Sequence, residues 1–504
     1  MFTPSTIVRL LQNVDISADY KNTFSFGSAS AQASFFSAKT KTGCAFTDFT
    51  YQRKESVLKV KVNIETLWNV NYLMFQNTNF GSKWFYAFIT DMQYVNDNVT
   101  SITFDVDVMQ TWLFDLDIKD CYIEREHVLN DTIGNHLLDE NLNTGEYIIA
   151  QNSSFYSGKF MAVVIGVTKL SDGTTPATGD MYGGVYSGLA YYAFDPYSDV
   201  LGINDFIASY VAAPTAITTV FLIPDCSLPT GWASGDLIPS DFRISYTEVL
   251  SQLSNINGYI PKNNKLFSFP YNFVVVDNAD NAQLIYKYEY FTSSVVFDIR
   301  VASTGNPQMQ LFPKNYKGIE NNLEECIVIS NYPQCAWTTD VYASWLAQNS
   351  VSNTIGIASS FLGLVVGMST LNPISMASGV IGVSSTIGQF YEKSLIPNQV
   401  SGTQQNDISV AWSEKTFKFY QKQIRDENAK MIDNFLSMYG YKVNELKVPN
   451  FTTRPNWNYL KLIEVNIFGN IPNSHLVKIH SIFKNGLTFW HNDNVGNYNR
   501  TNEL

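Results

Sequence analysis

The stretch that decides the fold is ITFDVDVMQTWLFDLDI, Ile102–Ile118, in which apolar and polar side chains alternate. The even positions are nearly all apolar, and the odd positions are mostly polar. Four of the odd positions are carboxylates: Asp105, Asp107, Asp115 and Asp117. A period of two held over this length predicts a half-buried strand or hairpin. Residues 56–64 repeat the pattern, so we expect an antiparallel sheet with one solvated face.

Outward from this stretch, the chain is expected to be mainly β with a minor α component. Short apolar runs in the middle of the chain alternate with turn residues and predict further strands: Phe160–Val167, Thr218–Ile223, Phe273–Val276 and Ser293–Ile299. Near the C-terminus, Trp412–Tyr439 has helical spacing, and Gly440 is placed to end that helix. We expect four segments: an N-terminal β tube domain (1–150), an inserted β-rich region (151–340), an uncharged hairpin or plug (341–406), and a C-terminal helix with strands that complete the tube domain (407–504).

The segment Val341–Tyr391 contains no Asp, Glu, Lys, Arg or His. Asn372-Pro373 divides it into two arms of about 20 residues, each about 30 Å long if helical, which matches the hydrocarbon thickness of a bilayer. The small residues Ser359, Gly363 and Gly367 recur every fourth position, as in packed membrane helices. One interpretation is a buried helical pair in a large core. The other is a concealed hairpin that is released at a membrane, because the many Ser and Thr residues make a permanent span too polar.

The residues that carry the membrane hypothesis are those that would line the two arms and their turn. They are Ile355, Ser359, Phe361, Leu362, Gly363, Leu364, Val365, Val366, Gly367, Asn372, Pro373, Val380, Ile381, Gly382 and Ile387.

The composition excludes several classes of protein. The formal net charge is −12, so the chain as a whole is not a DNA-coating protein. Charged residues make up only 15% and aromatic residues 14%, which favours large surfaces buried against partner subunits over intrinsic disorder. The five cysteines form no CxxC pair and are expected to be reduced, although Cys326 and Cys335 are close enough in sequence to meet in a hairpin. The N-terminus lacks the apolar run of a secretory signal.

Motifs of enzymes are missing from the sequence. It has no GxSxG, HExxH, Walker or GxGxxG motif, and its five histidines lack metal-ligand spacing. We therefore expect no catalytic, cofactor-binding or metal-binding residues. Four carboxylates were considered as a glycosidase acid/base pair, although nothing in the sequence predicts their separation: Glu124, Glu126, Asp139 and Glu140.

The four aspartates of the opening stretch have two interpretations. In a monomer they would form an ordinary solvated face. On the inside of a ring they would form an anionic wall that repels DNA phosphates and does not bind them, since tight phosphate binding requires Lys and Arg. Such a wall suits a conduit, so Asp105, Asp107, Asp115 and Asp117 are candidates for a lumen lining.

Three stretches carry a resemblance to a known family. They are DYKNT (Asp19–Thr23), the run from YLMFQNTNFGSKWFYAF to CYIEREHV (Tyr72–Val128), and FKNGLTFWHNDNVGNYNRTNEL (Phe483–Leu504). With the apolar segment between them, they resemble the tail knob, or distal tail tube, proteins of short-tailed phages with protein-primed linear genomes. The similarity is strongest over 1–150 and 410–504, so both ends are expected to form one composite β-structure.

The resemblance implies a structural, non-enzymatic protein of the virion, located at the distal end of the tail and assembled in the host cytoplasm. It implies a homohexamer that contacts other tail proteins, namely tube or collar proteins and a cell-wall-degrading tip protein. Double-stranded DNA would pass through it without tight binding, and hairpins at about 345–400 would penetrate the host membrane. The alternative is a module that binds or degrades cell-wall glycan, for which four tyrosines of the middle region would stack on sugars: Tyr182, Tyr186, Tyr191 and Tyr192.

Overall fold

The strands of this chain are grouped into two units in a computed structural model, which describes residues 6–49, 56–78, 81–155, 161–335 with short gaps, and 416–502. The first unit is discontinuous: Met1–Thr144, Gly258–Leu266 and Asp426–Leu504. The second unit contains the remaining segments, Gly145–Asn257 and Phe267–Arg425. The C-terminal segment of the first unit therefore begins at Asp426, whereas the sequence placed its start at 407. The short segment Gly258–Leu266, called the excursion below, belongs to the first unit although its neighbours in sequence belong to the second. No feature of the sequence predicted this.

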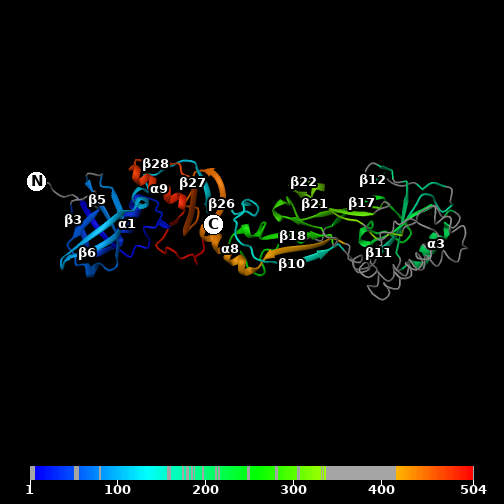
Figure 1. Ribbon diagram of the computed structural model, residues 1–504, viewed down its shortest axis with the longest axis horizontal. Coiled ribbons are helices and arrows are strands. Elements are labelled where there is room, and N and C mark those ends of the chain that lie inside the picture. The colour runs from blue at the N-terminus through cyan, green and yellow to red at the C-terminus, as the bar shows by residue number, and fades with distance from the viewer. Residues whose placement is uncertain are drawn as a thin grey trace, which may run out of the picture. The chain divides into compact units, whose positions relative to one another are not determined.

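The first sheet of the first unit is antiparallel, with the strand order β3-β1-β5-β6-β7-β4. Its strands β3, β5 and β6 are labelled in Figure 1. Its strands are β1 (Thr6–Gln12), β3 (Thr40–Phe49), β4 (Val57–Val60), β5 (Val70–Asn77), β6 (Trp84–Asn96) and β7 (Val99–Val106). Alternate residues such as Leu10 and Ile102 are fully buried, as a one-sided sheet requires. The hydroxyl of Ser28 caps helix α1 (Ala29–Ala38), and the buried Phe36 of this helix stacks on Tyr72 with ring centroids 5.4 Å apart.

The alternating stretch 102–118 is neither one strand nor a hairpin within one sheet, which corrects the prediction. Strand β7 ends at Val106, and Asp107 caps the short helix α2 (Val108–Trp112). A two-residue strand, β8 (Asp117–Ile118), follows and pairs with β28 (Ile467–Phe468). The second run, 56–64, is likewise shorter than expected, because β4 ends at Val60 and a 3₁₀ turn, Ile64–Leu67, follows.

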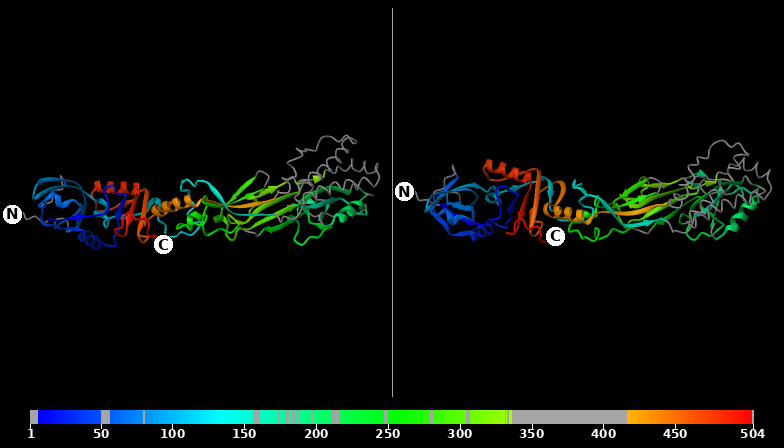
Figure 2. Two further views of the ribbon diagram at one scale, coloured as in Figure 1. Left: turned by 90° about the horizontal axis from the view of Figure 1, so that it is seen from below. Right: turned by 60° about the horizontal axis from the view of Figure 1, so that its bottom comes forward.

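The second sheet of the first unit contains strands from both ends of the chain, in the order β2-β29-β27-β9-β26. These are β2 (Asn22–Phe24), β9 (Cys121–Glu126), β26 (Tyr441–Lys447), β27 (Trp457–Glu464) and β29 (Leu487–Trp490). Strand β2 runs parallel to β29, and the Trp490 indole donates to Asn22 at 2.8 Å. Helix α9 (Asn473–Asn485) packs against β27, and both views of Figure 2 show this helix in red beside the strands of the sheet. The two ends thus share one backbone hydrogen-bond ladder.

The predicted helix Trp412–Tyr439 is correct only in its second half. The part from Lys418 to Ile424 is strand β25, with alternating burial, and only Asp426–Tyr439 forms a helix, α8. Asp426 and Glu427 lie in its first turn, where carboxylates favour the helix dipole. Gly440 ends the helix as predicted, with φ +67° and its N–H bonded to the Leu436 carbonyl at 2.8 Å. Residues 412–415 lie outside the described part of the chain.

In the residues that the structure describes, the second unit consists of β-sheets with one short α-helix. The predicted strands appear as β11 (Met161–Val167), β15 (Ile217–Pro224), β18 (Asn272–Asp277) and β20 (Phe297–Ala302). The first sheet has the order β10-β25-β18-β19, the second β16-β14-β11-β15-β24, and the third β17-β20-β21-β22 with β23 paired to β21. The other elements are β10 (Tyr147–Ser154), β12 (Met181–Tyr182), β13 (Val185–Tyr186), β14 (Ala190–Phe194), α3 (Val200–Ser209), β16 (Asp236–Ile238), β17 (Asp241–Tyr246), β19 (Gln283–Tyr286), β21 (Gln308–Tyr316), β22 (Ile319–Asn321), β23 (Ile327–Ile329) and β24 (Gln334–Cys335).

Among the described residues, a shared cluster of buried apolar side chains joins the three larger sheets of the second unit. Val276 and Phe419 from the first sheet, Ile165 from the second and Ile299 from the third belong to one cluster of buried side chains. Ring contacts such as Tyr246 on Phe419, 4.8 Å between centroids, join strands that are far apart in sequence. The fold is mainly β with a minor α component, as predicted.

The cysteines are reduced where the structure describes them. Cys44 and Cys121 are buried thiols, and Cys226 and Cys326 are partly buried thiols. Cys326 is therefore not joined to Cys335, whose side chain lies outside the description.

Candidate functional site

Asp107 differs from the other three candidate lumen residues, because its side chain is buried. It is only 1% exposed, and its carboxylate accepts from the Gln110 N–H at 3.0 Å and from the Tyr72 hydroxyl at 2.8 Å. Burial raises the pKa of Asp107 to about 6, although both hydrogen bonds act in the opposite direction. Asp107 is a helix cap inside the first unit, so its assignment to an exposed acidic face was wrong. Aspartate is a common N-cap residue, so Asp107 could have been predicted to begin a helix. The alternating pattern favoured a continuous strand instead.

The other three aspartates are each paired with a lysine. Lys478 of α9 contacts Asp105 at 2.7 Å, and Lys119 contacts Asp117 at 2.9 Å. Asp115 is bonded to Lys83. These pairs are solvent-exposed and stabilise the fold by at most about 1 kcal/mol each. Their consequence is electrostatic: the three lysine–aspartate pairs together carry little net charge.

Two of the lysines also lie over aromatic rings. The Lys83 ammonium is 3.8 Å from the centroid of the Trp112 ring, and the Lys478 ammonium is 5.2 Å from that of Tyr20. The Trp112 indole in turn donates to His475 Nδ1 at 2.9 Å. Helix α9, from the C-terminal end of the chain, thus supplies Lys478 and His475 to the neighbourhood of β7 and α2.

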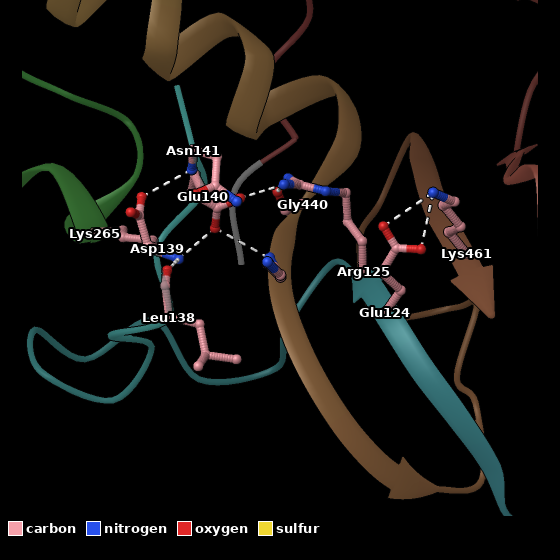
Figure 3. A network of polar contacts seen from close by, with 10 residues as sticks. Glu124, Arg125, Leu138, Asp139, Glu140, Asn141, Lys265, Gly440 and Lys461 are labelled. Atoms are coloured by element: carbon pink, nitrogen blue, oxygen red, sulfur yellow. Dashed lines mark hydrogen bonds and ion pairs between the residues drawn. The ribbon is translucent and has the colours of Figure 1, made fainter. Parts of the chain in front are cut away.

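The carboxylates considered as a glycosidase pair are occupied by structural contacts, and Figure 3 shows those of Glu124, Asp139 and Glu140. Glu124 bonds Lys461 at 2.8–2.9 Å, and Glu126 bonds Lys447 at 2.6 Å. Asp139 accepts from the backbone N–H of Asn141 at 2.8 Å. These groups form an ion-pair network within the first unit, and nothing in their geometry favours acid/base catalysis.

Glu140 is the buried centre of this network. Its carboxylate is bonded to Arg125, to Lys265 and, at 3.1 Å, to the backbone N–H of Lys442. Burial lowers the pKa of Lys265, and the adjacent Glu140 offsets part of that effect. Two cations around one buried carboxylate hold the excursion 258–266 against β9 and β26.

A second buried carboxylate, Asp433 of α8, holds the same excursion. It accepts from the Tyr259 hydroxyl at 2.6 Å, the Lys262 N–H at 2.9 Å and the Asn263 side-chain amide at 2.7 Å. Asp131 adds a bond from the Asn264 N–H at 2.9 Å. Sequence reasoning missed this network, because the partners lie more than 130 residues apart in the chain.

The histidines are structural, and the described residues contain no cluster of His, Cys, Asp and Glu suited to a metal. His127 is 4% exposed; its Nδ1 accepts from the Tyr459 N–H at 2.8 Å, and its Nε2 lies 3.0 Å from the Ser437 carbonyl. Burial is the largest cause that lowers the pKa of His127 to about 4, with a further contribution from Arg454. The ring is therefore neutral at pH 7.

The tyrosines considered for glycan stacking are only partly described. Tyr191 is buried, and Tyr192 packs on Phe206 with ring centroids 5.0 Å apart. The side chains of Tyr182 and Tyr186 lie outside the description. The two described rings contribute to a core and offer no open stacking platform.

The candidate membrane hairpin lies wholly outside the described residues, since nothing between 336 and 415 is described. Among the helices that the structure does describe, none combines the length and the hydropathy needed to span a bilayer. The membrane assignment of this segment therefore remains a prediction from sequence.

Comparison with known proteins identifies the class of protein. Residues 4–117, which include the first sheet, match the family model for the N-terminus of the caudoviral major tail protein. The chain is thus a β-rich structural protein of a phage tail. Residues 240–503, more than half of the chain, match the model for the C-terminal domain of the tail knob protein gp9 of Bacillus phage phi29. The chain belongs to this tail knob family.

Full-length relatives agree with this assignment. The chain is 28% identical to the tail knob protein gp9 of Bacillus phage B103 and 27% identical to that of Bacillus phage PZA, in each case over 99% of this chain and 98% of the relative. The tail knob protein gp12 of bacteriophage C1 has a similar structure, with a TM-score of 0.62 over 98% of both chains at 15% identity. The expected family, structural role and location in the virion tail are confirmed, and the chain is not an enzyme.

Proposed function

We propose that six copies of this chain assemble into a tail-tip ring that conducts double-stranded DNA and that releases apolar hairpins into the host membrane. The relatives support this proposal, because the match to tail knob proteins extends over the whole chain and includes the uncharged segment. The low charge and high aromatic content also favour subunit contacts. A closed ring is the simplest assembly that provides a channel.

The charge pattern of the first unit suits a passage for DNA. A wall that binds phosphates tightly needs an excess of Lys and Arg. Asp105, Asp115 and Asp117 offset Lys478, Lys83 and Lys119. A surface of such pairs neither holds nor strongly repels a moving polyanion. We place these three aspartates at the lumen as part of the proposal and leave Asp107 out, because it is buried.

The observation that carries membrane penetration is the run of 51 uncharged residues, Val341–Tyr391. A charged residue at the centre of a membrane costs about 2.5–3.5 kcal/mol. Inside lipid the backbone must satisfy its own hydrogen bonds, so the two arms would become helical there.

Liposome leakage tests this proposal. The parent protein should release an entrapped dye, whereas a deletion of 345–400 should assemble normally and release none. The variant Val365→Asp should also leak less, because it places a charge within the first arm. Ser401→Asp, outside the uncharged run, is the matched control and should leak like the parent. Equal leakage from the deletion and the parent would refute membrane penetration, and failure of the deletion to assemble would make the segment a structural core.

Glycan binding is the weaker candidate, since Tyr191 and Tyr192 pack inside the second unit. Incubation with purified cell walls should release no reducing ends and should retain no protein in the wall pellet. Release of reducing ends would revive the enzymatic alternative.

A further inference from the structure

A small cavity in the first unit is lined by cationic and neutral polar side chains. His127, which directly follows strand β9, lines one side of the cavity, and Ser437 near the end of α8 also lines it. The loop before β27 brings Arg454, and the C-terminal segment brings Arg500. The other lining residues are Lys262, Asn263, Trp457, Tyr498 and Asn502. None of these described lining residues is an aspartate or glutamate.

Three cations of different depth surround this cavity. Arg454 is 9% exposed, whereas Lys262 and Arg500 are exposed at the surface. The enclosed space is about 20 Å³, enough for one water-sized group. One oxygen of an oxyanion fits inside, and the rest of that group would lie at the mouth beside Lys262 and Arg500.

The segment that carries Arg500 is fixed on both sides. Tyr498 packs edge-on against Trp457, with ring centroids 5.2 Å apart. The Asn502 side chain accepts from the backbone N–H groups of Asn456 and Trp457 at 2.9 and 3.2 Å and donates to the Trp457 carbonyl at 2.8 Å. Arg500 is therefore held near the cavity by anchors two residues away on either side, which limits the entropy lost when a ligand is bound.

The carboxylate behind the cavity offsets only part of its positive charge, because three cations line the cavity. The carboxylate of Asp433 is fully buried and bonded to Tyr259 and to the backbone and side chain of the 262–263 turn. His127 is held neutral, with its pKa lowered to about 4 by burial and by the nearby Arg454 and Arg125. The neutral ring therefore leaves the charge of the cavity to Arg454, Lys262 and Arg500.

We propose that this cavity is an oxyanion site that binds a phosphate group. Guanidinium groups bind phosphate oxygens in pairs, and three cations around one small opening favour a doubly charged group over a single carboxylate. The group would come from free inorganic phosphate or from a phosphomonoester at the end of a larger molecule. This proposal does not depend on ring assembly or membrane penetration.

Isothermal titration calorimetry with inorganic phosphate, at constant ionic strength, tests the site on the full chain. The parent should bind one phosphate per chain, and Arg500→Gln and Lys262→Gln should each weaken binding about tenfold. Both side chains are exposed, so these variants are expected to fold, which circular dichroism would verify. Lys119→Gln removes an exposed lysine elsewhere in the unit and should bind like the parent. No saturable binding by the parent, or equal binding by the parent and Arg500→Gln, would overturn the proposal.

The same titration with glycerol 3-phosphate distinguishes the two sources. Binding within a few-fold of inorganic phosphate, lost in Arg500→Gln, would assign the site to a phosphomonoester end. Binding of inorganic phosphate alone, lost in the same variant, would assign it to the free ion. Acetate should bind at least tenfold more weakly than phosphate, because it offers a single charge. Acetate binding as tight as phosphate would contradict the proposed ligand class.

Discussion

Two buried ionisable side chains of the first unit respond to acid in opposite directions. The folded state keeps His127 neutral with a pKa of about 4, below its ordinary value of 6.5. It also keeps Asp107 protonated up to a pKa of about 6, above its ordinary value of 3.8. Acidification therefore lowers the stability of the folded state through protonation of His127 and raises it through protonation of Asp107. The stability of the parent should change less with pH than that of either single variant.

His127→Gln should remove the first of these effects. The histidine's contribution is complete above pH 6.5 and is lost as the pH falls through about 4, because the unfolded state takes up a proton that the folded state refuses. The loss is on the order of 3 kcal/mol. Denaturant unfolding at pH 7.5 and pH 5 should show the variant less stable than the parent at pH 7.5, and this difference in stability should be smaller at pH 5. A variant with the parent's pH dependence would contradict this.

Asp107→Asn should have the opposite signature. The folded carboxyl binds its proton more tightly than the unfolded one, so the parent gains stability from this group as the pH falls from about 6 towards 3.8. Asparagine can still cap α2 but does not titrate. In unfolding experiments over this pH range the variant should lose stability relative to the parent as the pH falls. A constant difference between the two proteins would show that Asp107 does not titrate in the folded state.

The sequence showed which ionisable residues to consider, but it did not show which of them are buried or what they contact. All four aspartates of 102–118 occupy equivalent positions in an alternating pattern, yet Asp107 is buried and Asp105 is exposed. The difference arises from Tyr72 and from the turn into α2, which are tertiary features. The contacts of Glu140 and Asp433 were equally unpredictable from the sequence, because their partners come from distant segments.

At the scale of elements, the wrong predictions have a common physical cause. Apolar residues at 417, 420 and 424 suit a helix, yet those at 417 and 419 also suit one face of a strand, and pairing with β10 and β18 decides for the strand β25. The helix begins only at Asp426, where acidic residues favour its first turn. Strands flanked by clear turn residues, such as β11 and β18, were predicted correctly within two residues of each boundary.

Gly440→Ala should disrupt the junction between α8 and β26. Its φ is +67°, and an added Cβ would lie 2.1 Å from the Glu126 carbonyl oxygen of β9. The backbone would have to shift, at a cost of about 2–4 kcal/mol in the free energy of unfolding. Gly496→Ala is the matched control, since its φ is +81° but nothing lies within 4 Å of the added Cβ. It should cost about 1 kcal/mol, and an equal loss in both variants would disprove the close approach.

At the scale of the whole molecule, the proposed conduit depends on which face lines the channel. Replacing Asp105, Asp115 and Asp117 with lysine adds six positive charges per subunit and leaves Lys478, Lys83 and Lys119 without their partners. Lysine clusters bind DNA phosphates, so phage carrying this triple variant should eject DNA more slowly, and added salt should relieve the delay.

The matched control carries the same charge change at exposed positions elsewhere: Glu320→Lys, Glu324→Lys and Asp493→Lys. Ejection by the control should match the parent, as followed by fluorescence of a DNA dye outside the particle. If the first triple variant also ejects at the parent's rate, these aspartates do not line the channel.

The central claim is a ring of six copies around a channel, and the mass and shape of the purified protein test it most directly. Mass photometry combined with negative-stain images should show particles of six 56.8 kDa chains, about 340 kDa, with a central opening. The same particles should persist after deletion of 345–400, because the ring is attributed to the β-structure. A uniform 56.8 kDa monomer at micromolar concentration, or particles with no opening, would contradict the account.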